Sequence, residues 1–129
     1  MQICITYVFL ITLFYLGRQD FSTKFINSLW LIPSLVLAFL IHPKTCLFVL
    51  FGYLCAILLN HISHENWIGY GDLDVLACGL CVAPNLMWFT WLNAACCVQF
   101  ALQIFYYRQR QAPFVPSLVI GWTLTASLI

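Results

Sequence analysis

The segment Trp67-Ile68-Gly69-Tyr70-Gly71-Asp72-Leu73-Asp74 stands at the edge of a long apolar run and holds two of the chain's four acidic side chains. A charge at the margin of a hydrocarbon layer is costly, by ~2.5 to 3.5 kcal/mol at mid-depth, so such residues are functional candidates by default. Gly69 and Gly71 let the backbone reach dihedrals closed to other residues and let another chain approach without meeting a Cβ. A structural interpretation stays open beside this one, in which the glycines form a turn and Asp72 caps the N-terminus of the following helix.

The composition predicts a membrane protein. Of the 129 residues, 64% are hydrophobic and 7% are charged, and five Lys/Arg with four Asp/Glu cannot cover a soluble core of this size. A net charge of +1 excludes nucleic acid as a partner, because no basic stripe exists to neutralise phosphates. Residues 3–16 have no basic segment before them and no small-residue cleavage site after them, so we expect a retained first span and not a signal peptide.

Seven cysteines are spread along the chain, and most of them lie inside apolar runs, where cysteine behaves as a small hydrophobic residue. Cys78 and Cys81 have the C-x-x-C spacing of metal and redox sites. No second pair stands at a zinc-site distance, so we expect no bound metal.

Five breaks divide the apolar sequence into six segments, at residues 17–24, 42–44, 60–72, 83–85 and 108–113. In lipid, only helices and closed barrels satisfy their backbone hydrogen bonds, and the polar alternation of barrel strands is absent from this sequence. We therefore expect one all-α, polytopic membrane domain over residues 1–129 with about six transmembrane helices. The expected spans are residues 3–16, 26–41, 45–59, 73–83, 86–107 and 114–129, several of them shorter than the ~20 residues of a full crossing.

The break at Pro84 decides the predicted topology. A single helix over residues 73–107 would be ~50 Å long, well beyond a ~30 Å hydrocarbon core, and it would contain a proline. A hairpin at Pro84 instead places four basic residues on one face and Lys44 alone on the other, and the more basic face is expected to be cytoplasmic. Those four are Arg18, Lys24, Arg108 and Arg110. The N-terminus should then lie outside, and the cytoplasmic side should hold all four acidic residues: Asp20, Glu65, Asp72 and Asp74.

This topology brings two carboxylates from different breaks to one face. Asp20 follows the first helix and Asp72 starts the fourth, so the two helices between them return the chain to the same side. An alternative for Asp20 is an interfacial acid beside Arg18.

Other hydrolytic residue sets are not present, because Ile68 stands where an H-E-x-x-H zinc motif needs its second histidine and no G-x-S-x-G occurs. Two close carboxylates cannot both ionise cheaply, so one keeps a proton to polarise a carbonyl while the other takes a proton from water.

Three motifs resemble those of one family. Gly69-Tyr70-Gly71-Asp72, followed by Leu-Asp-Val-Leu-Ala, resembles the GxGD motif of the type IV prepilin peptidases, six-helix aspartyl proteases of the membrane. Residues 20–27 resemble that family's first aspartate motif, and residues 113–118 resemble the proline-rich start of its last helix. The chain departs from the family at Asn27, where proline is usual, and at Asp74, where lysine is common. The cysteine-rich cytoplasmic domain of the large bacterial enzymes is also missing.

The resemblance implies an aspartic endopeptidase of the prokaryotic plasma membrane that removes the short leader of prepilins or pseudopilins on the cytoplasmic side. Asp20 and Asp72 would be catalytic, Gly69 and Gly71 would shape the approach of the substrate, and no metal or organic cofactor is implied. Since 129 mostly apolar residues offer no place for a methyl donor, we expect cleavage without N-methylation. The rival hypothesis is a small membrane transporter or secretion-assembly subunit that uses the same acids for ion binding or helix contacts.

Asp74 follows Asp72 by two residues, or ~200° around a helix, so only one of the two can face Asp20. The resemblance selects Asp72. We expect Asp74 to be a first-turn acid that interacts with the helix dipole, with a contribution of ~0.3 to 1 kcal/mol.

Overall fold

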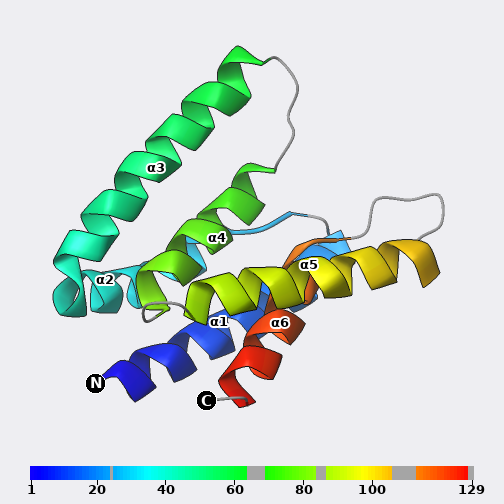
Figure 1. The fold of residues 1–129 in the computed structure, drawn as a ribbon, viewed down its shortest axis with the longest axis horizontal. Helices are drawn as coiled ribbons and strands as arrows, with labels where there is room; N and C mark the ends of the chain where they lie inside the picture. Colours follow the sequence, from blue (N-terminus) through cyan, green and yellow to red (C-terminus); the bar gives the residue numbers. More distant parts are fainter. Residues whose placement is uncertain (24, 64–68, 84–86, 106–112, 128–129) are drawn as a thin grey trace.

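The computed structural model describes residues 1–23, 25–63, 69–83, 87–105 and 113–127, and every regular element in these ranges is helical. The prediction of an all-α fold is therefore confirmed. The elements are α1 (Gln2–Thr23), the 3-10 helix η1 (Ser28–Leu31), α2 (Ile32–Ile41), α3 (Pro43–Ile62), α4 (Tyr70–Val82), α5 (Met87–Phe105) and α6 (Val115–Ser127), as drawn in Figure 1.

The first helix is longer than predicted. We expected a break from residue 17, but α1 continues to Thr23 and carries Asp20 in its last turn. Arg and Gln are good helix formers even though they are polar, so residues 18 and 19 do not interrupt the backbone. The Ser22 and Thr23 hydroxyls then bond back to the Gln19 carbonyl oxygen, at 3.1 and 2.9 Å. The aspartate is consequently held on a helix and not in a loop.

The fourth helix begins earlier than predicted. Gly69 is its N-cap residue, with extended dihedrals (φ −61°, ψ 138°), and its carbonyl oxygen already accepts the Leu73 N–H at 3.0 Å. Asp72 is therefore the acid of the first turn, and the interpretation of Asp72 as the N-cap is wrong. Asp74 lies beyond the first turn, so its predicted role as a first-turn acid is also wrong.

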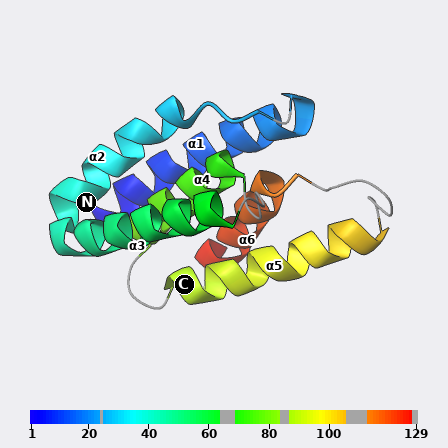
Figure 2. The same cartoon turned by 90° about the horizontal axis from the view of Figure 1, so that it is seen from above.

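Separate helices occupy the region on either side of the predicted hairpin. Helix α4 ends at Val82, and α5 begins at Met87 and runs back in the opposite direction (Figures 1 and 2). The single long helix over residues 73–107 is thereby excluded, while Pro84 itself lies outside the described residues.

Successive long helices alternate in direction, which decides what meets at each end of the bundle. Figures 1 and 2 show the end of α1 and the starts of α4 and α6 at one end, which we call the Asp20 end. The N-terminus and the junction of α2 with α3 lie at the other. Residues far apart in sequence are thus brought together at the Asp20 end.

The core lies between α1, α4 and α6, closed on one side by α5. Phe9, Trp91 and Trp122 pack edge to face, with ring centroids 4.8 to 6.2 Å apart, in the geometry that aromatic pairs favour. A Cβ at Gly79 would lie 2.1 Å from the Trp91 ring, and one at Gly121 would lie 2.8 Å from the Ala95 backbone nitrogen. These two glycines let α4 and α6 approach α5 closely.

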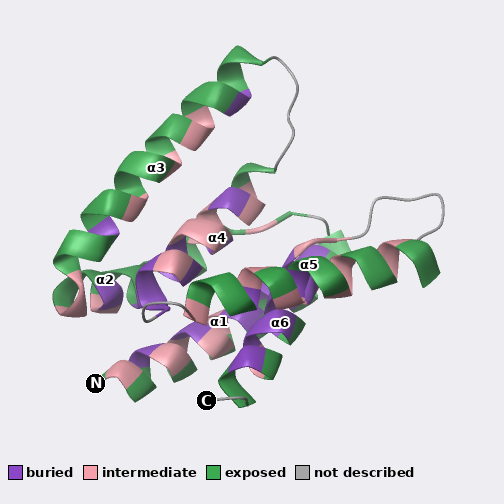
Figure 3. Cartoon of the chain, viewed as in Figure 1, coloured by how far each residue is buried: buried purple, intermediate pink, exposed green. Residues whose placement is uncertain are grey.

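Helix α3 stands at the periphery, and Figure 3 shows it exposed along most of its length. Its buried residues are Cys46 and Asn60, near its two ends. Helices α3 and α5 are both long and apolar enough to cross a membrane, with mean hydropathies of 2.0 and 1.2. The segments Ser28–Ile41 and Val115–Ser127 are apolar but shorter.

Candidate functional site

Asp20 lies at the point where α1 meets the start of α6. Its side chain is 7% exposed, and its Oδ2 accepts the backbone N–H of Val115 at 3.3 Å. Val115 is the first residue of α6, and the first N–H groups of a helix have no partner within the helix. The helix dipole also favours a negative charge at this position. The start of the last helix therefore supports a carboxylate on the first.

Asp72 lies in the first turn of α4 and interacts electrostatically with Asp20. It is half-buried, and it lies just ahead of the apolar segment that begins at Leu73. Burial raises the pKa of Asp72 from its ordinary value of 3.8 to about 6, and repulsion by the charge of Asp20 adds to this rise. The structure thus brings Asp20 and Asp72 close enough to interact electrostatically. We had predicted this from the two helices that lie between them in the sequence.

A pair of this kind has a defined chemical capacity. Below about pH 6, Asp72 keeps its proton because burial and the charge of Asp20 oppose its ionisation, and the apparent pKa values belong to both groups together. One carboxylate is then available as a general base and one carboxylic acid as a general acid.

The two glycines of the motif lie against parts of this same chain. A Cβ at Gly69 would lie 3.3 Å from Oδ2 of Asp72, so glycine leaves room for that carboxylate. A Cβ at Gly71 would lie 3.0 Å from the Cβ and 3.1 Å from the Cδ1 of Ile26. The sequence had suggested a substrate as the approaching group, but at Gly71 the nearest neighbour is the segment that follows α1.

Asn27, where the resembling family usually has proline, makes use of a backbone N–H that proline lacks. That N–H donates to Oε1 of Gln19 at 3.4 Å, and the Asn27 side chain accepts the Leu29 N–H at 3.2 Å. Asn27 thereby caps η1 and ties it to the last turn of α1. The departure at this position has a structural explanation.

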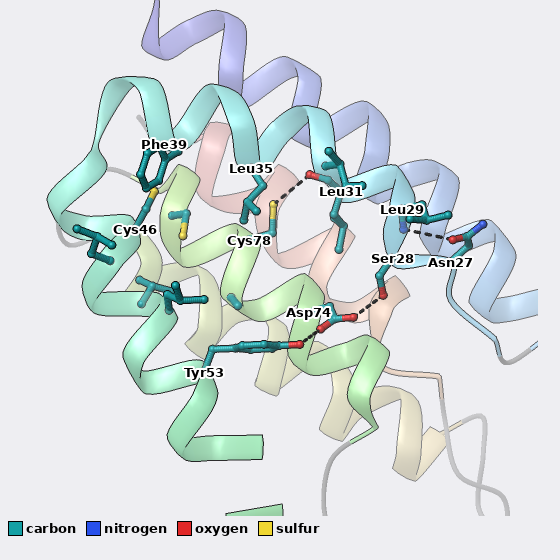
Figure 4. Close-up of a pocket in the computed structure, with 16 residues that line it drawn as sticks. Asn27, Ser28, Leu29, Leu31, Leu35, Phe39, Cys46, Tyr53, Asp74 and Cys78 are labelled. Atoms are coloured by element: carbon teal, nitrogen blue, oxygen red, sulfur yellow. Dashed lines mark hydrogen bonds between the residues drawn. The ribbon is translucent and has the colours of Figure 1, made fainter. Parts of the chain in front are cut away.

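Asp74 is the residue whose role the sequence missed. Its Oδ2 accepts the Ser28 hydroxyl from η1, and its Oδ1 accepts the Tyr53 hydroxyl from α3 (Figure 4). The ~200° separation of Asp72 and Asp74 indicated that the two face different neighbours. Nothing in the apolar run around Tyr53 indicated which neighbours those are.

Two largely apolar cavities flank Tyr53. One, of about 500 Å³, lies between η1, α2, α3 and α4, and the other, of about 700 Å³, is lined mainly by residues of α3 and α4. Tyr53 lines both. Cys46, Cys78 and Cys81 line the smaller cavity, where they are buried free thiols (Figure 4). Within the described ranges, no group of three His, Cys, Asp or Glu residues is arranged to hold a metal ion.

The predicted sidedness rests partly on residues that the structure does not describe. Arg18 stands near the end of α1 and Lys44 at the start of α3, so they belong to opposite ends of the bundle. Four further charged residues of that prediction lie outside the described residues: Lys24, Glu65, Arg108 and Arg110. The position of the second histidine in the zinc motif, Ile68, also lies outside them.

No family model matches this chain, and neither does any curated protein or solved structure.

Proposed function

We propose that this protein is an aspartic endopeptidase embedded in the plasma membrane of a prokaryote, which removes the short polar leader of prepilins or pseudopilins on the cytoplasmic side. The observation that carries the proposal is the meeting of Asp20 and Asp72 at the Asp20 end of the bundle. Two interacting carboxyl groups are costly in so apolar a chain, and the roles that justify this cost are mainly acid-base catalysis and ion binding.

In the proposed reaction, water enters between the two carboxyl groups and the scissile peptide. Asp20, as the charged partner, takes a proton from the water while the water oxygen attacks the carbonyl carbon. Asp72, as the protonated partner, gives its proton to the carbonyl oxygen, so the tetrahedral intermediate forms without a free oxyanion. On collapse of that intermediate the C–N bond breaks, Asp20 gives the proton that it took from water to the leaving amine, and one hydroxyl of the intermediate returns its proton to Asp72.

The membrane placement is part of the same proposal. We place about six helices across the bilayer with the N-terminus outside, and the lengths and hydropathies of α3 and α5 support this placement. Exposed large apolar side chains follow the outer faces of both helices, Phe48, Phe51 and Leu58 on α3 and Phe89 and Phe100 on α5. Apolar surface of this extent is suited to contact with lipid.

Co-expression with a candidate prepilin tests the function. Intact-mass measurement should show loss of the leader with the wild-type protein and no loss with Asp20→Asn or Asp72→Asn at matched membrane levels. An amide at position 20 cannot accept the water's proton, and an amide at position 72 cannot give a proton to the carbonyl oxygen. Glu65→Gln is the matched control, since it removes an acidic side chain that the reaction does not use. Cleavage that persists in both aspartate variants would sink the proposal and leave the transporter or assembly role as the better account of the two acids.

A further inference from the structure

Asp74 fastens three elements to one another within a short distance of Asp72. Each of its carboxylate oxygens accepts one hydroxyl, from Ser28 and from Tyr53 (Figure 4). We call these three residues the Asp74 clamp. Hydrogen bonds to an ionised acceptor are stronger and more directional than those between neutral groups. The clamp therefore restrains η1 and α3 relative to α4.

The clamp is connected to the other aspartate as well. Ser28 directly follows Asn27, whose backbone N–H donates to the side chain of Gln19, and Gln19 is the neighbour of Asp20. A continuous set of contacts thus runs from the last turn of α1 through η1 to α4. The packing of Ile26 against Gly71 lies in the same connection.

Tyr53 connects α3 to the Asp74 clamp. The Tyr53 side chain reaches from α3 to Asp74 on α4 and lines the cavities of about 500 and 700 Å³. Its hydroxyl bonds to Asp74 at a position between Cys46 and Asn60, the two buried residues near the ends of α3. Loss of this bond would free the middle of a helix that is otherwise largely exposed.

Asp72 and Asp74 lie ~200° apart on α4, so a restraint on one fixes the direction of the other. We propose that Asp74 is a positioning residue for the reaction proposed above, holding the rotation of α4 through Ser28 and Tyr53 so that Asp72 faces Asp20. This role rests on the proposed function. Asp74 touches neither substrate nor Asp20 in it, and it acts through the orientation of Asp72.

Tyr53→Phe is the sharpest test, because it removes one hydroxyl and keeps the ring that lines the two cavities. Displacement of a catalytic group by about 1 Å can cost about 100-fold in rate, so we expect kcat for a prepilin-like substrate to fall about 10- to 100-fold with little change in KM. The upper limb of the pH profile should shift as well, since Asp72 moves relative to Asp20. Tyr7→Phe, which removes the hydroxyl of an exposed tyrosine on α1, is the matched control.

Ser28→Ala and Asp74→Asn complete the set. The amide oxygen of Asp74→Asn can still accept one hydroxyl, so this variant should lose less activity than Asp74→Leu. The double variant Tyr53→Phe/Asp74→Leu should be little worse than Asp74→Leu alone, because both changes remove the bond between Tyr53 and Asp74. Additive losses would show that the residues act independently and would overturn the clamp.

A second readout does not depend on cleavage. Labelling by a membrane-permeant maleimide, followed by peptide mass spectrometry, reports the accessibility of the buried thiols of Cys46, Cys78 and Cys81, which line the same cavity as Tyr53. We expect faster labelling of these three in Tyr53→Phe and unchanged labelling in Tyr7→Phe. Unchanged labelling in Tyr53→Phe, or a loss of kcat without a shift of the pH profile, would overturn the positioning role.

If the wild-type protein cleaves nothing, the proposed function fails, and the positioning role fails with it. Normal cleavage by Tyr53→Phe would remove the positioning role alone.

Discussion

Replacement of Asp72 by asparagine should abolish cleavage and at the same time stabilise the protein at neutral pH. In the folded protein, burial and the charge of Asp20 raise the pKa of Asp72 from 3.8 to about 6. Between these two pH values the folded state binds more protons than the unfolded state, so the free energy of unfolding falls as pH rises. Above about pH 6 the folded state carries the full cost of the ionised carboxyl, and asparagine removes that cost.

The magnitude follows from the pKa. A rise from 3.8 to about 6 corresponds to ~3 kcal/mol, and solvent screening at a half-buried side chain reduces the expected gain to roughly 1 to 2 kcal/mol. For a chain of this length, that is an increase of roughly 3 to 8 °C in Tm. The assay is thermal unfolding in detergent micelles, with wild type, Asp72→Asn and the control Glu65→Gln compared at pH 7.5 and at pH 4.

At pH 4 the advantage of Asp72→Asn should largely disappear, because the wild-type carboxyl is then mostly protonated in the folded protein. Glu65→Gln should give no such pH-dependent difference. An equal change in Tm at both pH values, or a lower Tm for Asp72→Asn at pH 7.5, would refute the account of Asp72 as a group forced to ionise against burial and against Asp20.

Four further predictions concern other parts of the molecule. Gly71→Val should lower the cleavage rate because the new Cβ would lie 3.0 Å from Ile26. The double variant Gly71→Val/Ile26→Ala should recover activity. A double variant as inactive as Gly71→Val would indicate that the substrate, and not Ile26, needs the space at Gly71. Gly79→Ala should cost at least about 1 to 3 kcal/mol of stability, measured by Tm, since its Cβ would lie 2.1 Å from the Trp91 ring, and an unchanged Tm would contradict this packing. Tags at Lys44 and Arg110 should report opposite sides of the membrane, and finding both on one side would remove the six-crossing topology. A substrate processed by this protein alone should lose its leader and gain no methyl group by intact mass, and an added methyl would reveal a second activity.

The helices could be predicted well because their boundaries depend on local chemistry. Long apolar runs and the breaks between them placed α3, α4, α5 and α6 within about three residues of where they lie. The second span was predicted from residue 26, whereas η1 begins at Ser28 and α2 at Ile32. The end of α1 was missed because Arg18 and Gln19 are polar, and polarity was taken as a break although both residues favour helix. Polar residues indicate that a segment is exposed to water, but whether the helix continues through that segment depends on the helix propensity of its residues.

The candidate site divides in the same way. The meeting of Asp20 and Asp72 follows from the number of helices between them, so the chain order was sufficient to predict it. The bond from Tyr53 to Asp74 and the packing of Ile26 on Gly71 depend on the rotation of each helix about its axis. Apolar residues surround Tyr53 on all sides of α3, so the sequence contains no polar face from which that rotation could be predicted.

The bond between Asp20 and the N–H of Val115 joins the first helix of the chain to the last, with consequences for biosynthesis. Both aspartates leave the ribosome well before α6 does. A nascent chain, or a product truncated before Val115, would carry the two carboxyl groups without the backbone donor that supports one of them. The support of Asp20 is then complete only when α6 has taken its place, and we expect a chain truncated before Val115 to be inactive in the proposed reaction.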